Sequence, residues 1–295
     1  MKKFATRAAA PALAAAVTLA PASAAGVPIP IPGSGDAAPQ QSTAAAPTRV
    51  SFNVATFNVL GGGHSKGRGG MRSGTARMKG TISYLRKHDV VLAGFQELEG
   101  KQAASLRKRT KHRWVVVGAP SRNGKKIDTR NSIGYRKSSF TLVRRTHLPI
   151  TYFHGNRVNI PLVKLKSKKN GATFWVLNTH NPADVHGNAG RWRAESVRRQ
   201  FERIHRLRNN GQTVIFTGDM NAKRDFFCRV TRSKVLHSAS GGSVGKPCRY
   251  PKRNGIDWIL GTRDVGFKRW RSDTSTRSRG VSDHPIIVAR ATVSR

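Results

Sequence analysis

The sequence has 295 residues, of which 37% are hydrophobic, so it can form one large domain with a sizeable core and is unlike a disordered chain. Its 54 Lys and Arg residues exceed its 14 Asp and Glu residues by 40, which gives a formal net charge of +40. A chain this basic attracts polyanions, so nucleic acid is the first partner to consider and an anionic lipid surface is the second.

The N-terminal residues 1–24 resemble an export signal. Lys2 and Lys3 provide a positive start, an Ala-rich apolar stretch follows at 8–20, and Ala22-Ser23-Ala24 fits a cleavage site. The apolar stretch is too short to span a membrane. We therefore expect a secreted, extracellular protein.

Composition then divides the remaining chain into two parts. Residues 25–48 are rich in Pro and Ala and almost free of charge, as is typical of a flexible linker. From residue 49 onward, short apolar runs alternate with turn residues, and no second linker or internal repeat is visible. We expect 49–295 to form a single domain.

Short runs of β-branched and aromatic residues, bounded by Gly, Pro, Asn or Asp, predict buried strands in this domain. In chain order they cover 50–57, 90–95, 114–118, 132–135, 174–178, 213–217, 257–260 and 285–289. Apolar residues at helical spacing predict helices around 78–85 and 197–207. Many strands with interspersed helices indicate an α/β or α+β sandwich.

Four of the 14 acidic residues stand at or beside the edge of a predicted strand: Glu97, Asp219, Asp257 and Asp283. A carboxylate at such a place is costly to desolvate unless it is paired or holds a metal ion. Turn acids exposed to solvent would explain any one of the four, but they explain the whole set poorly.

Polar residues of a second kind share these boundaries, namely Asn58, His180, Asn221 and His284. Carboxylates and carboxamides suit a hard cation, so we expect Mg²⁺, with Mn²⁺ and Ca²⁺ as alternatives. The sequence contains no CxxC, HExxH or P-loop motif that would indicate a zinc protease or a nucleoside-triphosphate site. His64, by contrast, is expected to be a surface imidazole.

Six short segments in fixed order carry a resemblance. They are Phe57-Asn58, Gln96-Glu97, Thr179-His180, Gly218-Asp219-Met220-Asn221, Ile256-Asp257 and Ser282-Asp283-His284. Together they resemble the endonuclease/exonuclease/phosphatase superfamily, of the deoxyribonuclease I-like type, over the whole domain. The resemblance implies an α/β fold: a four-layer α/β sandwich of two packed mixed β-sheets flanked by helices.

The resemblance also implies roles for individual residues. Asn58, Glu97 and Asp283 resemble metal-binding residues. Asp219 and Asn221 resemble the pair that orients the attacking water and binds the phosphate, with Asp219 as the base. His284 resembles the imidazole at the scissile phosphate, oriented by Asp257, and His180 resembles the second histidine of the site.

Two features depart from the family pattern. His180 is followed by Asn181-Pro182 in place of the usual Leu, and an acid is missing elsewhere. Deoxyribonuclease I-like members carry an acid, before the strand at 131–135, that pairs with the residue matching His180. The corresponding segment 118–123 has no acid here, and Asp128 is the nearest one. The sequence therefore leaves the partner of His180 open.

The two cysteines, Cys228 and Cys248, are expected to form a disulfide, because an exported protein permits one. Two free buried thiols are the alternative.

Three functions are compatible with these observations. The first is a secreted, monomeric, metal-dependent nuclease that hydrolyses DNA or RNA. The second is a lipid phosphodiesterase or a phosphatase of the same fold, for which an exposed apolar hairpin would be a sign, and 150–153 is the segment to check. The third is a non-enzymatic polyanion-binding protein, which would not need the site residues that this sequence retains.

Overall fold

Two six-stranded sheets organise the computed structural model, which describes residues 48–65 and 71–294. The first sheet has the order β11-β12-β1-β2-β4-β3, and only β1 and β2 run parallel. Its strands are β1 (Arg49–Asn58), β2 (Val90–Gln96), β3 (Trp114–Pro120), β4 (Ile127–Arg136), β11 (Gly266–Asp273) and β12 (Ile286–Ser294).

The second sheet repeats this plan with the order β5-β6-β7-β8-β10-β9, and only β7 and β8 run parallel. Its strands are β5 (Phe140–Thr151), β6 (Arg157–Ser167), β7 (Thr173–His180), β8 (Val214–Asp219), β9 (Leu236–Ser238) and β10 (Asp257–Thr262). Each sheet therefore contains one parallel pair, whose two strands end at the same edge.

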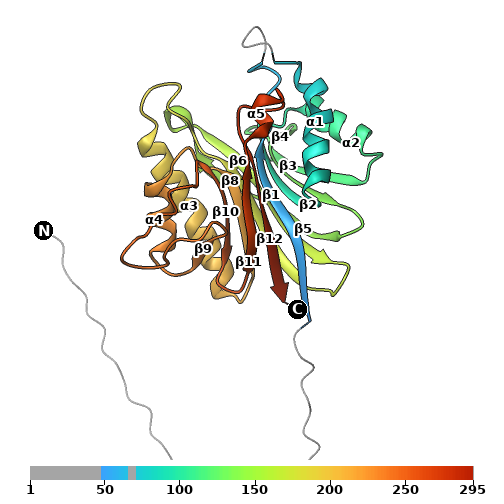
Figure 1. Ribbon diagram of the computed structural model, residues 1–295. Helices are drawn as coiled ribbons and strands as arrows, with labels where there is room; N and C mark the ends of the chain where they lie inside the picture. Colours follow the sequence, from blue (N-terminus) through green and yellow to red (C-terminus); the bar gives the residue numbers. More distant parts are fainter. Residues whose placement is uncertain (1–47, 66–70, 295) are drawn as a thin grey trace, which may run out of the picture. The chain divides into compact units, whose positions relative to one another are not determined.

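Helices cover both outer faces, as Figure 1 shows. Helices α1 (Gly74–Lys87) and α2 (Gly100–Arg109) lie on the first sheet, and α3 (Gly190–Asn209) and α4 (Arg224–Thr231) lie on the second. Two short helices, η1 (Phe153–Gly155) and α5 (Ser275–Ser278), join strands. The predicted four-layer α/β sandwich is confirmed.

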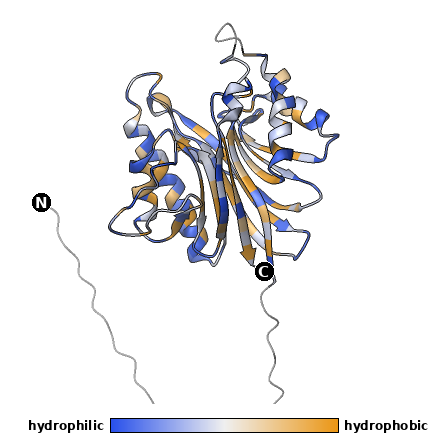
Figure 2. Cartoon of the chain, in the orientation of Figure 1, coloured by the Kyte–Doolittle hydropathy of each residue, from blue (hydrophilic) through white to orange (hydrophobic). Residues whose placement is uncertain are grey.

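Three buried apolar clusters hold the four layers together. One lies between the two sheets and includes Phe52 and Phe174, whose rings stack 5.4 Å apart. The other two lie between each sheet and its helices, and they include Met78 of α1 and Trp258 of β10. Hydrophobic residues accordingly follow the strands, and hydrophilic ones cover the outer helices (Figure 2). Burial of this apolar area is the main favourable contribution to folding.

The eight predicted strand regions coincide with β1, β2, β3, β4, β7, β8, β10 and β12, and the two predicted helices coincide with α1 and α3. The long β5–β6 hairpin was not predicted. One face of the hairpin is exposed to solvent. Basic residues such as Arg144, Arg145 and Lys164 therefore stand among the apolar residues of these two strands. Its pattern therefore lacks the continuous apolar run of a buried strand.

A buried polar network crosses between the sheets beneath the parallel strand ends. Gln96 donates to Asn178 Oδ1 at 2.7 Å, and Thr217 donates to the same oxygen at 3.0 Å. Gly94 lies against these groups, since a Cβ at this position would come within 2.1 Å of Thr217 Oγ1. The close approach of the two sheets thus requires glycine here.

The predicted disulfide between Cys228 and Cys248 is present, and it ties α4 to the loop before β10. The described residues from 49 onward fall within one compact unit. The predicted signal peptide, 1–24, and the predicted linker up to residue 47 lie outside the described residues. Among the helices that are described, none combines the length and the apolar character needed to cross a membrane.

Candidate active site

The two parallel strand pairs bring the first four site residues to one edge of the sandwich. Asn58 ends β1. It pairs with Gln96, the last residue of β2, and Glu97 directly follows. In the other sheet, His180 ends β7 opposite Asp219, which ends β8. Because the carboxyl ends of parallel strands share an edge, residues far apart in the sequence meet there.

Antiparallel strands bring the remaining residues to the same edge. Asp257 begins β10 and lies opposite Asp219 in the register of the second sheet. Asp283 and His284 immediately precede β12, which pairs with β1 in the first sheet. The site therefore draws side chains from both sheets.

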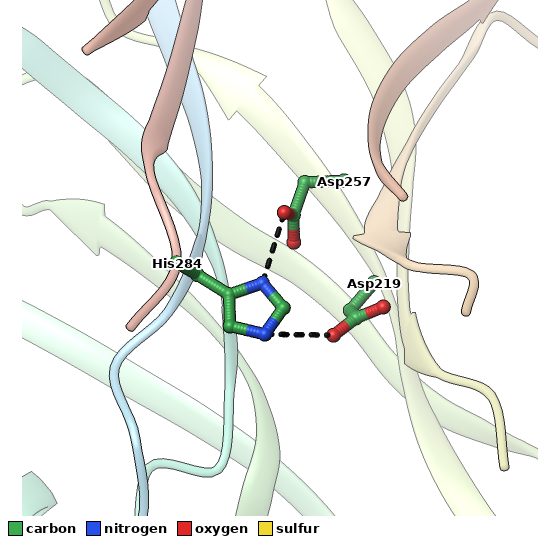
Figure 3. A group of neighbouring side chains, drawn as sticks. All are labelled: Asp219, Asp257 and His284. Atoms are coloured by element: carbon green, nitrogen blue, oxygen red, sulfur yellow. Dashed lines mark hydrogen bonds and ion pairs between the residues drawn. The ribbon is translucent and has the colours of Figure 1, made fainter. Parts of the chain in front are cut away.

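Asp219 is the centre of this group and is 1% exposed. Its Oδ2 accepts a hydrogen bond from Asn58 Nδ2 at 3.2 Å, and it lies 3.4 Å from His180 Nε2 and 3.7 Å from His284 Nε2. Figure 3 shows His284 between two carboxylates, with Asp219 on its Nε2 side and Asp257 on its Nδ1 side. A buried carboxylate surrounded by donors in this way can accept a proton from a bound water.

The His284–Asp257 pair is short and largely buried, with 2.9 Å between Nδ1 and Oδ2. Burial alone would lower the pKa of His284, but the hydrogen bond that it donates to Asp257 and the charges of Asp257 and Asp219 raise this pKa well above its ordinary value. Burial and the charge of Asp219 raise the pKa of Asp257, against the effect of His284. The imidazole is therefore held protonated at neutral pH, with Nε2 as a donor toward the site.

Glu97 adopts a positive φ of 58°, which turns its side chain back toward Asn58. Its carboxylate accepts hydrogen bonds from Asn58 Nδ2 at 3.0 Å and from the Gly61 amide at 2.8 Å. Burial would raise the pKa of Glu97, but the charge of His180 and these two hydrogen bonds lower it overall. Glu97 is thus an anionic carboxylate that can receive a cation.

Hydrogen bonds link the predicted metal-binding residues through Asn58. Its side chain donates to Glu97 at 3.0 Å, and its carbonyl accepts at 2.6 Å from the hydroxyl of Ser282, which lies 3.4 Å from Asp283 Oδ1. Asp283 is exposed and Glu97 is partly so, which keeps carboxylate oxygens available, and such oxygens suit Mg²⁺. The Oδ1 of Asn58 accepts from the Leu60 amide, and its nitrogen donates to the carboxylates of Glu97 and Asp219. It orients Glu97 and Asp219 in this arrangement.

A second group could in principle hold a metal ion. Among the described residues, Asp219, Asp257 and His284 each offer one ligand atom, and these atoms lie within 4.8 Å of one another. A metal ion bound there would compete with the hydrogen bond between His284 and Asp257. We therefore assign these residues to proton transfer and the cation to Glu97 and Asp283.

Asn221 also adopts a positive φ, of 47°, in the turn that follows β8. Its amide N–H donates to Asp219 Oδ1 at 2.9 Å, and its side-chain nitrogen donates to the Asn181 carbonyl at 2.8 Å. The first bond fixes Oδ1 of Asp219, and the second holds the turn in place. Asparagine tolerates this backbone conformation better than most residues.

The structure gives His180 a partner that the sequence left open. Its Nε2 lies 3.4 Å from Asp219 Oδ2, and its Nδ1 lies 4.0 Å from Glu97 Oε1. Asp128 is instead bound by Arg130 at 2.6 Å. Two carboxylates of the site itself therefore replace the separate acid of the family pattern.

Two further residues at the site were not predicted. Arg77 on α1 is 2% exposed, and its guanidinium donates to the carbonyls of Val59, Leu60 and Val281, which holds the ends of β1 and of the loop before β12 together. His64 was expected to be a surface imidazole. Its side chain is indeed exposed, but its Nδ1 reaches Glu97 Oε2 at 3.2 Å. No motif in the sequence indicates these contacts, because Arg77 is a single arginine on a helix and His64 lies in a Gly-rich segment.

The chain was compared with known proteins in three ways. The model of the endonuclease/exonuclease/phosphatase family matches residues 55–284, a range that begins just before Asn58 and ends at His284. A search of curated proteins by sequence finds no match.

Solved structures of similar fold cover most of this chain. An endonuclease/exonuclease/phosphatase family protein from Bacteroides thetaiotaomicron is 19% identical, with a TM-score of 0.64, over 84% of this chain and 97% of its own. The human Nocturnin catalytic domain with bound sulfate is 14% identical, with a TM-score of 0.65, over 84% and 98%. The mannosyl-6-phosphatase from Bacteroides thetaiotaomicron is 19% identical, with a TM-score of 0.61, over 81% and 99%. At these identities the likeness concerns the fold.

Proposed function

Because the chain belongs to the endonuclease/exonuclease/phosphatase family, whose members are phosphoric ester hydrolases, we propose that it is a divalent-metal-dependent phosphodiesterase and that its substrate is nucleic acid. The observation that carries the proposal is the convergence of His180, His284 and Asn58 on the buried carboxylate of Asp219. This arrangement places a base and a charged donor at one point, which is what hydrolysis of a phosphodiester requires.

The chain's own residues account for the proton transfers. Asp219 accepts a proton from water, which then attacks phosphorus. His284, kept protonated by Asp257, donates to an oxygen of the phosphate, and its position is fixed by the 2.9 Å bond. A divalent cation held by Glu97 and Asp283 would neutralise phosphate oxygens and stabilise the leaving oxygen.

The charge of the chain favours nucleic acid among the possible phosphodiesters. From Arg49 onward there are 54 − 3 = 51 basic and 14 − 1 = 13 acidic residues. Four of these acids, Glu97, Asp219, Asp257 and Asp283, belong to the site itself. A surface with this excess of cations attracts the phosphate backbone over long range and binds it in a salt-dependent way.

A lipid phosphodiesterase is the second candidate, and the described residues give it less support. Ile150, in the segment where an apolar hairpin was to be checked, is fully buried in the core under α3. The large hydrophobic residues exposed in the described part of the chain are Ile127 on β4, Val143 on β5 and Val185 in the loop before α3. They do not form an apolar hairpin that could enter a membrane.

A non-enzymatic polyanion-binding protein is the third candidate. Binding a polyanion does not require a buried carboxylate that two imidazoles face. Burying such groups costs free energy, so their presence favours an enzyme. Export is part of the proposal: the signal-like residues 1–24 support it, and so does the disulfide between Cys228 and Cys248, since disulfides persist in oxidising compartments.

Parallel incubations test the proposed function. The purified protein is mixed with plasmid DNA, with RNA and with sphingomyelin vesicles, each with Mg²⁺ and with EDTA. We expect nicking of DNA or cleavage of RNA with Mg²⁺ and none with EDTA. Hydrolysis of sphingomyelin alone would replace this proposal with the lipid phosphodiesterase.

A further inference from the structure

A basic pocket adjoins the site on the side of the second sheet's helices. It has a volume of about 450 Å³ and lies between the start of α3, the turn after β8 and the start of α4. Asn221 and Ile256 line it, so its wall is formed by neighbours of Asp219 and Asp257. One water occupies ~30 Å³ in the liquid, so the pocket can hold a hydrated phosphate group.

Three cations that line this pocket have no carboxylate partner. Lys223, Arg224 and Arg229 are exposed, and they make no ion pair with any Asp or Glu in the part of the chain that the structure describes. A fourth, Arg193, differs because both of its terminal nitrogens are bound to Asp184, at 2.8 and 3.1 Å.

The only other charged lining residue is Asp225, on the first turn of α4, so the pocket has an excess of positive charge. Lys223, at the N-terminal cap of α4, makes no side-chain capping hydrogen bond. The N-terminus of a helix carries a partial positive charge and free N–H groups, which add to the attraction for an anion.

The pocket lies close to the reacting group. Asn221 is bonded to Asp219 through its amide N–H, and Lys223 follows Asn221 by two residues, a span of at most ~7 Å along the backbone. A substrate whose scissile phosphate lies at Asp219, His180 and His284 can therefore place its next phosphate in the pocket.

We propose that this pocket, formed by Lys223, Arg224 and Arg229 beside Asn221, is a subsite for a second phosphate of the substrate, next to the scissile one. The proposal rests on the proposed function, because it takes the substrate to be a nucleic-acid strand. Such a subsite would make the site prefer a strand with several phosphates over an isolated phosphodiester.

The test compares two variants that each lose one Lys and one Arg. Lys223→Gln/Arg224→Gln removes charge from the pocket. Lys108→Gln/Arg109→Gln removes the same charge from the exposed C-terminal turn of α2, away from the site. Binding of a fluorescent oligonucleotide is measured by anisotropy in EDTA at several salt concentrations. Cleavage with Mg²⁺ is measured on the same oligonucleotide and on a dinucleoside monophosphate, which has one phosphate.

We expect the pocket variant to bind the oligonucleotide about tenfold more weakly, as for the loss of a charged hydrogen bond. The slope of its salt dependence should fall by about 0.7 for each phosphate that the pocket no longer neutralises. Its cleavage of the oligonucleotide should fall through a higher KM, and its cleavage of the dinucleoside monophosphate should match the unmodified protein. The control variant should change binding much less.

Equal loss of oligonucleotide binding in both variants would overturn the subsite, as would equal loss of cleavage on both substrates. The proposed function fails separately, if the unmodified protein binds the oligonucleotide but hydrolyses neither substrate with Mg²⁺. The anisotropy comparison still decides the subsite in that case. An unmodified protein that does not bind the oligonucleotide contradicts the subsite directly.

Discussion

Asn58 on β1 donates through Nδ2 to Oδ2 of Asp219 on β8, 3.2 Å away, and so joins the two sheets at the site. The same nitrogen donates to Glu97 at 3.0 Å. One amide thus lies between the carboxylate assigned to the cation and the carboxylate assigned to the base, and it keeps the two anions apart at a fixed distance. The site depends on the packing of the sheets because its two halves come from different sheets.

Replacing Asp219 by Asn tests its role as the base. The substitution keeps the size of the side chain but removes the charge that His180 and His284 face. We expect kcat to fall by ~10²–10⁴, the usual contribution of a general base, with little loss of nucleic-acid binding. The control is Asp89→Asn, an exposed acid just before β2 at the other end of the sheet, and cleavage assays compare the two. Similar activities of the two variants would refute the assignment.

Glu97→Gln tests the assignment of the cation. The neutral side chain keeps its shape but attracts Mg²⁺ less, so we expect the Mg²⁺ concentration at half-maximal activity to rise at least about tenfold. Activity is measured over a Mg²⁺ titration. Glu99→Gln is a close control, because Glu99 accepts from the Gly63 amide at 2.9 Å and makes no ion pair among the described residues. An unchanged Mg²⁺ requirement in Glu97→Gln would place the cation elsewhere.

Gly94→Ala tests the contact between the sheets. The new Cβ would lie 2.1 Å from Thr217 Oγ1 and 2.2 Å from Asn178 Oδ1, so the buried polar network must shift. We expect the free energy of unfolding to fall by ~1–3 kcal/mol or more, measured by urea denaturation. Gly100→Ala is the matched control, because a Cβ there meets no atom within 4 Å. Equal stabilities of the two variants would mean that the sheets are less tightly packed than described.

Asp273 gives a prediction about pH. It lies 2.8 Å from Lys87 Nζ and 2.9 Å from His88 Nε2, at the end of α1. Burial would raise the pKa of Asp273, but the hydrogen bonds from Lys87, Ser275 and His88 hold it well below its ordinary value. A lowered folded-state pKa adds stability above the unfolded pKa, near ~3.9, and this stability is lost as the pH falls further.

We therefore expect Asp273→Asn to unfold more easily at pH 7, by ~1–3 kcal/mol. The difference from the unmodified protein should shrink as the pH falls below ~4. Urea denaturation at a series of pH values measures the difference in the free energy of unfolding, with Asp89→Asn as the control. A difference that stays constant across this range would show that the ion pair is not its cause.

The sequence predicted a group of polar residues that the structure brings together, because each of them follows or precedes a buried strand. Apolar runs that end in Asn58, His180 or Asp219 are visible in the sequence, but the parallel pairing that brings these ends to one edge is seen only in the structure. The family model then matches the same range, 55–284. The β5–β6 hairpin escaped prediction because its exposed face carries basic residues among the apolar ones.

Contacts that depend on strand register and on the course of the loops could not be predicted. Nothing in the sequence around His180 shows that Asp219 is its partner, since the two residues are 39 positions apart and meet only through the β7–β8 register. The direction of the Asn58 amide is likewise decided by the Leu60 N–H that its oxygen accepts. Arg77 was missed because its partners are backbone carbonyls from separate loops.

Comparison of His284→Ala with the unmodified protein, in one assay of hydrolysis and one of nucleic-acid binding, decides whether this imidazole acts on the phosphate. His284 lies 2.9 Å from Asp257 and 3.7 Å from Asp219, and the account makes it the donor to the phosphate. We predict that hydrolysis with Mg²⁺ falls by ~10²–10⁴ while binding is retained, because the basic surface is unchanged. Hydrolysis that survives the substitution undiminished would contradict the account.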